Sequence, residues 1–152
     1  MVPTTAGRVP AHTDDAANQR IMMRTADRVR WYARHPEQID ERLRELDREW
    51  DVERTLEANA ATLAFGGTVL GIFADKRFLA IPLVVSGFLL QHALQGWCPP
   101  LPFLRKRGVR TAREIDEERM ALKALRGDFG RLGPGPDSHD TAAAHALQAA
   151  RL

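Results

Sequence analysis

Two long stretches without a charged residue constrain this chain more than any other feature. Residues 58–74 and 78–104 contain no Asp, Glu, Lys or Arg, although 28% of the 152 residues are charged. Only Asp75, Lys76 and Arg77 separate them. A helix that is apolar on every side must be covered by lipid or by protein, and a chain of this length has few helices to spare. We therefore expect an all-α protein, a transmembrane two-helix hairpin flanked by cytosolic amphipathic helices.

The lengths of the two stretches suit membrane spans. As α-helices, residues 58–74 would be about 25 Å long and residues 78–97 about 30 Å, against a hydrocarbon core of about 30 Å. We expect spans at 58–74 and 78–97 with a tip at 75–77, together forming a hairpin domain over 58–104. Trp97 suits the membrane interface, and the prolines from Pro99 onward end the second helix. The alternative is a soluble hairpin that the flanking arms bury.

The charges beside the hairpin predict its orientation. Five basic residues and no acidic residue occur in the nine positions after the second stretch: Arg105, Lys106, Arg107, Arg110 and Arg113. Basic excess marks the cytosolic side, so both termini should be cytosolic and the tip should face outward. The same residues can attract anionic lipid headgroups. A nucleic-acid partner is not expected, because the net charge is only +2 and no aromatic residues interleave the basic ones.

Small residues suggest how the two helices meet. A three-residue tip makes the helices antiparallel, and reflection about Lys76 places Gly66 and Gly67 opposite Ser86 and Val85, with Gly87 alongside. The closest approach is then expected at mid-membrane. Gly67 and Gly71 also form a small-xxx-small motif, which serves helix packing in membranes. Packing within the hairpin and contact in a homodimer both remain open.

A group of polar residues gathers at the cytosolic third of the predicted hairpin. It comprises Asn59, Gln91, His92, Gln95 and Cys98. Polar side chains in hydrocarbon are costly unless paired, so the group is either an internal hydrogen-bond cluster or a functional site. His92 and Cys98 alone do not make a metal site, and no other metal-ligand or cofactor motif is present. We expect no metal and no cofactor.

The region before the hairpin is expected to be a disordered N-terminus, residues 1–18, and a helical arm, residues 19–57. The arm has one apolar stripe before Pro36 and another after it. They consist of Ile21, Met22, Thr25, Val29 and Tyr32, then Ile39, Leu43, Leu46 and Trp50. The first stripe is typical of a helix that lies on a membrane surface or on a partner, and the second is a narrow apolar seam on an otherwise solvated helix. No Gly or Pro occurs between Glu37 and Phe65, so the helix is expected to run unbroken into the first span.

The region after the hairpin is expected to be a basic juxtamembrane segment with a C-terminal helix, residues 105–130, and a flexible tail, residues 131–152. Thr111 and Glu114 form a capping box that predicts the start of this helix. Gly127 and Gly130 predict its end.

Residues 53 to about 129 resemble the YgaP-like transmembrane domain family of the bacterial inner membrane, a two-helix domain of unknown function. The matching features are Glu53-Arg54, Asn59, Leu89-Leu90 and the Gly-Trp-Cys-Pro run at 96–99. Some members of that family carry a rhodanese module, which has no counterpart in this sequence. The resemblance thus implies a bacterial inner (cytoplasmic) membrane protein with a two-span hairpin, and it lends no enzymatic activity. The N-in/C-in topology is what the basic flanks predict.

The function expected from the sequence is a non-enzymatic membrane anchor and interaction module. Its partners would be the lipid bilayer and, through the amphipathic arms, a second copy or a cytosolic protein. One alternative is sulfur transfer or redox sensing by Cys98, whose thiolate Arg105, Lys106 and Arg107 would favour. Another is a polar transport path along Asn59, Gln91, His92 and Gln95, which two spans can enclose only in an oligomer.

Overall fold

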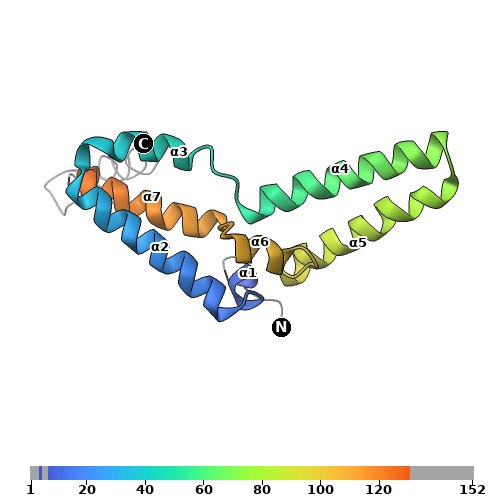
Figure 1. The fold of residues 1–152 in the computed structure, drawn as a ribbon, viewed down its shortest axis with the longest axis horizontal. Coiled ribbons are helices and arrows are strands. Elements are labelled where there is room, and N and C mark those ends of the chain that lie inside the picture. Colours follow the sequence, from blue (N-terminus) through green and yellow to red (C-terminus); the bar gives the residue numbers. More distant parts are fainter. Residues whose placement is uncertain (1–3, 5–6, 131–152) are drawn as a thin grey trace, which may run out of the picture. The chain divides into compact units, whose positions relative to one another are not determined.

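The computed structural model describes residue 4 and residues 7–130, and its regular structure is all helical, without a strand in that part of the chain (Figure 1). In chain order the elements are α1 (Arg8–Ala11), α2 (Asp15–Arg34), the 3-10 turn η1 (Pro36–Gln38), α3 (Ile39–Leu46), α4 (Val52–Phe73), the 3-10 turn η2 (Lys76–Leu79), α5 (Ala80–Gln95), α6 (Leu101–Arg107) and α7 (Ala112–Arg126). The expected all-α class is therefore confirmed. The predicted tail at 131–152 lies outside the described residues.

The chain forms two compact units, and each unit joins segments that are distant in sequence. Unit one consists of Met1–Arg24 and Glu49–Ile115, and unit two of Thr25–Arg48 with the residues from Asp116 onward. The arms predicted at 19–57 and 105–130 are thus each divided between both units. The physical reason in unit two is a set of ion pairs, such as Arg119 with Asp47, that ties its two segments together.

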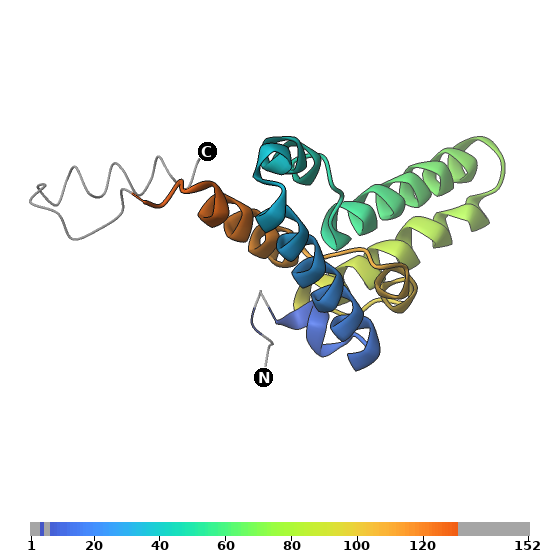
Figure 2. The ribbon, with the colours of Figure 1, turned by 60° about the vertical axis from the view of Figure 1, so that its left-hand side comes forward.

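The two charge-free stretches form α4 and α5, which pack against each other within unit one. They run side by side and are joined at one end through η2, and the turned view in Figure 2 shows the same pairing. Val52–Phe73 and Lys76–Gln95 are both long and apolar enough to cross a membrane. The predicted tip at 75–77 falls at the turn, where the Asp75 carboxylate accepts a hydrogen bond from the Arg77 N–H at 2.8 Å.

The first arm does not continue into α4, contrary to the expectation of an unbroken helix. The chain leaves helical conformation after α3 and re-enters it at Val52. Asp51 is the N-cap of α4, because its carboxylate accepts a hydrogen bond from the Arg54 N–H at 2.7 Å. The Val52 N–H donates to the Arg110 carbonyl at 2.9 Å, a bond it could not make inside a helix. A capping residue and a distant acceptor therefore break the helix without Gly or Pro.

The helix contact forms nearer the turn than reflection about Lys76 predicts. A Cβ on Gly67 would lie 2.8 Å from the Ile81 Cβ, and one on Gly71 would lie 2.5 Å from Leu79 Cδ2. Reflection had placed Gly67 opposite Val85. The difference arises because η2 winds directly into α5, so the residues next to the turn face α4.

The other small residues of the predicted packing set do not take part in this contact. Added Cβ atoms on Gly66 and Gly87 would meet nothing within 4 Å, and Ser86 is exposed. Gly67 is thus the glycine at which α5 approaches α4, and Gly71 is the glycine at which η2 approaches it.

The segment after α5 folds further than the sequence predicted. α5 ends at Gln95, and Gly96 takes up the left-handed conformation with φ 79°. The proline run does not extend as a linker, because Pro100 is the N-cap of the additional helix α6, where a missing N–H costs nothing. Arg105, Lys106 and Arg107 form the last turn of α6, and Gly108, also with a positive φ, ends it.

Residues 7–18, expected to be disordered, are ordered in the structure. α1 covers Arg8–Ala11 and α2 begins at Asp15. Val9 is 2% exposed and packs in a core cluster with Val52, Leu56, Cys98 and Leu101. The packing of Val9 explains why residues 7–18 are ordered. A single buried valine gives no periodic pattern, so the sequence did not predict it.

The helices of the charged arms largely follow their predicted patterns. Ile39, Leu43 and Leu46 are buried as the stripe predicts, whereas Met22 and Trp50 are exposed. The capping box is confirmed, with hydrogen bonds from the Thr111 N–H to Glu114 at 2.8 Å and from the Glu114 N–H to the Thr111 hydroxyl at 3.3 Å. α7 ends before Gly127, which has φ 89°, as predicted.

Candidate functional site

A cavity of about 430 Å³ lies in unit one, at the end of α4 and α5 that is remote from their turn. Its walls are formed by one face of each helix, by the segment between α5 and α6, and by α6 itself. The lining residues are Leu56, Asn59, Ala60, Leu63, Val85, Phe88, Leu89, His92, Cys98, Pro99, Pro100, Phe103 and Leu104. The lining is thus almost entirely apolar. Near the turn, α4 touches α5 and η2 through glycines. At the other end of α4 and α5, larger side chains line the space between the two helices, and this space is the cavity.

The structure brings three members of the predicted polar group to this cavity. Asn59, His92 and Cys98 all line it, whereas Gln91 and Gln95 do not. Asn59 is exposed, and its side-chain amide donates to the Thr55 carbonyl at 2.7 Å, one turn earlier in α4. The predicted cluster is therefore not a mutually bonded network, because its one amide in the cavity is satisfied by its own helix.

His92 is the buried polar residue of the cavity wall. It is 4% exposed, and neither ring nitrogen meets a hydrogen-bond partner among the described residues. The adjacent backbone is fully used, since the Gly96 N–H donates to the His92 carbonyl at 2.7 Å and the Arg8 guanidinium donates to the Ala93 carbonyl at 2.9 Å. A buried polar side chain without a partner is costly, so this ring marks the chemically distinctive point of the cavity.

Cys98 is held in an apolar setting that favours its protonated form. The residue is 3% exposed, and burial raises the pKa of its thiol even though the Leu101 N–H lowers it in part. The sequence had suggested that Arg105, Lys106 and Arg107 would favour the thiolate. The structure differs because the Arg105 guanidinium is taken up by the Glu114 carboxylate, with two contacts of 2.7 Å.

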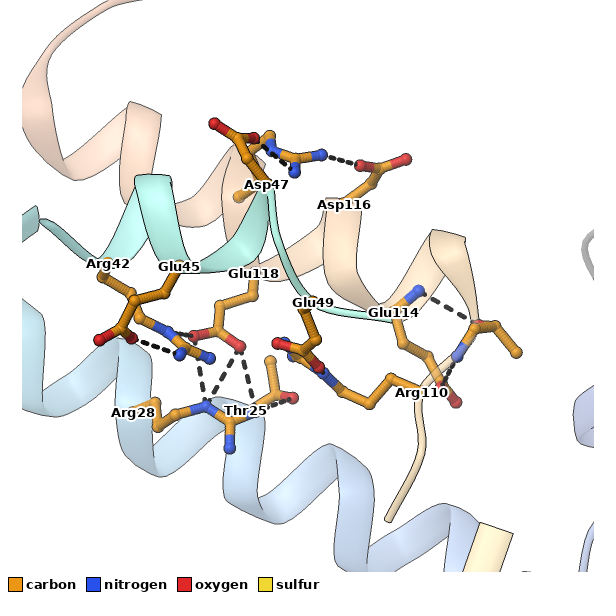
Figure 3. Close-up of polar contacts among 12 residues, drawn as sticks. Thr25, Arg28, Arg42, Glu45, Asp47, Glu49, Arg110, Glu114, Asp116 and Glu118 are labelled. Carbon is orange, nitrogen blue, oxygen red and sulfur yellow. Dashed lines mark hydrogen bonds and ion pairs between the residues drawn. The ribbon is translucent and has the colours of Figure 1, made fainter. Parts of the chain in front are cut away.

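The basic stretch divides into buried and exposed members. Arg105 is 1% exposed and also donates to the Asn18 side chain at 2.9 Å. Arg110 is 3% exposed and makes a two-pronged contact with Glu49, 2.7 Å at each oxygen (Figure 3). The sequence had suggested that Arg105 and Arg110 meet lipid headgroups. They are not placed to do so, because carboxylates within the fold hold them. The remaining members, Lys106, Arg107 and Arg113, are exposed.

Unit two contains a buried ion-pair cluster that the sequence analysis missed. The Glu118 side chain is 0% exposed and accepts hydrogen bonds from Arg42 at 2.8 Å and from Arg28 at 3.1 and 3.2 Å (Figure 3). Arg28 also donates to Thr25 at 3.2 Å. Arg42 also pairs with the Glu45 carboxylate at 2.8 Å, so two carboxylates balance the two guanidiniums, and the cluster suits a structural role. No local pattern distinguished Glu118 from its exposed neighbour Glu117.

The part of the chain that the structure describes has no set of side chains arranged to bind a metal ion. No group of three His, Cys, Asp or Glu side chains is close enough there to hold an ion. The cavity instead offers an apolar wall, one satisfied amide, one unpartnered imidazole and one protonated thiol. These groups suit the binding of an apolar molecule better than acid-base or nucleophilic chemistry.

Comparison with family models, with curated proteins and with solved structures gave no match for this chain.

Proposed function

We propose that this chain is an integral protein of the bacterial inner membrane, in which α4 and α5 cross the bilayer as a hairpin. Both termini are cytosolic in this proposal, and the turn at 75–77 faces outward. The protein acts as a non-enzymatic anchor, and its charged helices bind a second copy or a cytosolic protein.

The exposure of apolar side chains on α4 and α5 carries this proposal. Only 17% of the most apolar part of Val52–Phe73, and 6% of that in Lys76–Gln95, is buried. Large apolar side chains such as Phe73, at 83% exposed, and Leu83, at 76%, point away from the chain. Core helices of soluble proteins are mostly buried. The low burial of α4 and α5 therefore does not support the alternative of a hairpin that its own arms bury. A bilayer supplies the missing cover.

The orientation rests on the exposed basic residues that follow α5. Lys106, Arg107 and Arg113 are exposed, whereas the turn carries only two basic residues, Lys76 and Arg77. Basic residues near the end of a span favour the cytosolic side, where anionic lipids add attraction of about 1 kcal/mol per Lys or Arg. Arg105 and Arg110 are buried, so they contribute less to headgroup attraction than the exposed members of the basic stretch.

The interaction role is supported by exposed apolar residues on a charged helix. Met22 is 64% exposed and Met23 is 54% exposed on α2, between arginines of the same helix. Large exposed side chains of this kind serve adaptable protein contacts. The resemblance to the YgaP-like family fits the proposed membrane location and adds no reaction.

Extraction and labelling test the proposal directly. Because Cys98 is buried, the native thiol is a poor reporter, so single cysteines are introduced into a Cys98→Ser background at exposed positions, as Lys76→Cys and Arg107→Cys. We expect both variants in the pellet after an alkaline carbonate wash. A membrane-impermeant maleimide should label Lys76→Cys in intact spheroplasts and Arg107→Cys only after lysis. Release into the supernatant would overturn the membrane proposal, and the reverse labelling pattern would overturn the orientation.

The alternative function is sulfur transfer or redox sensing through Cys98. Its support is the position of the thiol on the wall of a cavity that a small molecule can enter. Burial raises the pKa of that thiol, which reduces the nucleophilic thiolate at neutral pH. Incubation with a persulfide donor, followed by mass analysis of the intact chain, tests it. An added sulfur atom that is absent from Cys98→Ser would support this alternative.

A further inference from the structure

We propose that a shallow hollow in unit one, between α2 and the end of α6, binds a phosphate group through Arg20, Arg24 and Lys106. This site goes beyond the anchor function, which treats Lys106 as one of several exposed charges and gives Arg20 and Arg24 no binding role. All three side chains are exposed, so a ligand at the surface can reach them.

The hollow is lined by two elements that are distant in the sequence. Its basic lining residues are Arg20 and Arg24 from α2 and Arg105 and Lys106 from α6, and none of its lining residues is acidic. Its volume is about 10 Å³, against about 430 Å³ for the apolar cavity between α4 and α5. That is room for about one water-sized group. The hollow can therefore seat one oxygen atom of a ligand whose other atoms lie among the exposed cations at its rim.

Arg24 and Lys106 approach the hollow from different helices. A Cβ on Gly108 would lie 3.4 Å from Arg24 Nη1, so the Arg24 guanidinium lies beside the residue that ends α6. Lys106 belongs to the last turn of the same helix. Like charges that face a common space repel each other, and an anion in that space relieves the repulsion.

The three proposed binding residues have no carboxylate partner in the part of the chain that the structure describes. The Arg20 Nε donates to a carbonyl of its own helix at 3.1 Å, and no ion pair joins Arg24 or Lys106 to an acidic side chain there. Arginines that reach another helix elsewhere do meet a carboxylate, as Arg42 meets Glu118 at 2.8 Å. The positive charge at the hollow is thus left for a ligand to compensate.

Arg105 lines the hollow but does not add to this uncompensated charge. Its guanidinium donates to both oxygens of Glu114 at 2.7 Å and to the Asn18 side chain at 2.9 Å. Its Nε is buried, so a ligand cannot reach that nitrogen. The binding charge is therefore that of the other three cations.

A phosphate group matches this set of donors better than a carboxylate does. A guanidinium binds phosphate through two parallel N–H···O bonds, and a Lys ammonium adds a compact point charge. A phosphomonoester carries a charge of about −1.5 to −2 at pH 7, so it offsets more of the three positive charges than a carboxylate can. A phosphomonoester should also bind more tightly than a phosphodiester, whose charge is lower.

The expected source of the phosphate is a lipid headgroup, and this point rests on the proposed membrane location. α6 begins at Leu101, shortly after α5 ends at Gln95, so in that arrangement the hollow lies near the headgroups. Basic pockets on the cytosolic side of membrane proteins bind anionic headgroups. A soluble phosphate ester presents the same group, and the experiment separates the two sources.

Native mass spectrometry of the full-length chain in a mild detergent tests the phosphate site, because it counts the lipid molecules that stay bound. Three lipids with the same acyl chains are titrated: phosphatidic acid, a phosphomonoester; phosphatidylglycerol, a phosphodiester; and phosphatidylcholine, which has no net charge. We expect the affinity to fall in that order. Equal retention of the three lipids would overturn the proposal.

Glycerol 3-phosphate, added as a competitor, identifies the source of the phosphate. Displacement of phosphatidic acid by this ester would assign the site to soluble phosphate esters as well. A preference for phosphatidic acid without such displacement would assign the site to lipid. These titrations are made in detergent, so their outcome is independent of the carbonate wash that tests the membrane location.

Charge-matched variants connect the result to the structure. Arg24→Gln and Lys106→Gln should each lower the affinity for phosphatidic acid about ten-fold, the value of one charge-assisted hydrogen bond. Arg34→Gln and Lys76→Gln remove the same charges from exposed positions outside the hollow, and each should change the affinity by less than about two-fold. Equal losses in the two pairs would show a general attraction of anions and would overturn the site. All four residues are exposed, and circular dichroism verifies that the variants fold.

Discussion

The α4–α5 pair and the charged helices α2, α3, α6 and α7 solve the problem of helix contact in opposite ways. On α4, contact depends on absent side chains, since Gly67 and Gly71 let Ile81 and Leu79 approach. The charged helices depend on long side chains that reach buried partners, as Arg42 reaches Glu118 and Arg105 reaches Glu114. The glycine contact involves only apolar groups, whereas the buried ion pairs are stable only if each charge has a partner of opposite sign. The two regions should therefore respond differently to the same kind of substitution.

The largest effect is expected in the buried ion-pair cluster. Glu118→Ala leaves Arg28 and Arg42 without the carboxylate they share and should lower the free energy of unfolding by about 3–5 kcal/mol. Chemical denaturation followed by circular dichroism measures the change. Glu41→Ala, at an exposed position of α3, is the control and should change it by less than about 0.5 kcal/mol. Equal effects would show that Glu118 contributes no more than a surface carboxylate.

The same charge introduced on exposed apolar positions of the two regions should give different results. Leu83→Arg places a cation on the uncovered face of α5, at a cost of about 2.5–3.5 kcal/mol for membrane insertion. Met22→Arg, at a similarly exposed site of α2, should have no such cost. The fraction of each variant retained after a carbonate wash measures the difference. If both variants stay in the pellet equally, α5 does not face lipid at Leu83.

Adjacent glycines sharpen the comparison on α4 itself. Gly67→Leu drives a side chain into Ile81 and Pro82 and should destabilise the helix pair by about 1–3 kcal/mol. Gly66→Leu enters open space and should be close to neutral. Unfolding in mixed micelles of increasing SDS content reports the stability of both. A loss at Gly66 instead would point to contact with a second copy through that face.

The smallest expected effect is the response of the ion pairs to acid. Burial alone would raise the pKa of Glu114. Hydrogen bonds from Arg105 and from the Thr111 N–H lower it by more than burial raises it, so the pKa lies below its ordinary 4.5. A lowered pKa stabilises the fold above pH 4.5, and this contribution is lost as pH falls through the lower value. Thermal unfolding from about pH 7 to about pH 3 should show the loss. Glu114→Gln should flatten that part of the profile, and an unchanged profile would contradict the assignment.

The sequence was sufficient where the signal is local. Absent charges located α4 and α5 to within several residues, the capping box marked the start of α7, and Gly127 marked its end. Each of these features depends on residues within about one helical turn or on one continuous stretch. Periodicity likewise identified the buried stripe of α3.

What the sequence did not predict depends on partners far along the chain. Arg105 and Arg110 were interpreted as surface charges because nothing near them shows that Glu114, Asn18 and Glu49 surround them. The contact between α4 and α5 lies nearer the turn than predicted because the sequence did not reveal the 3-10 turn η2 between the two helices. The sequence predicted no cavity at the polar group; that Asn59, His92 and Cys98 line one, and that His92 has no partner among the described residues, depends on the three-dimensional arrangement.

The contact between α1 and the end of α5 implies an order of events during synthesis. A Cβ on Gly96 would lie 2.6 Å from Arg8 Cβ, so the backbone at Arg8 rests directly on that glycine. The ribosome releases Arg8 long before it has translated Gly96, and all of α4 and α5 is made in between. α1 therefore cannot make this contact until α4 and α5 have both been synthesised, so its docking follows the completion of the two apolar helices.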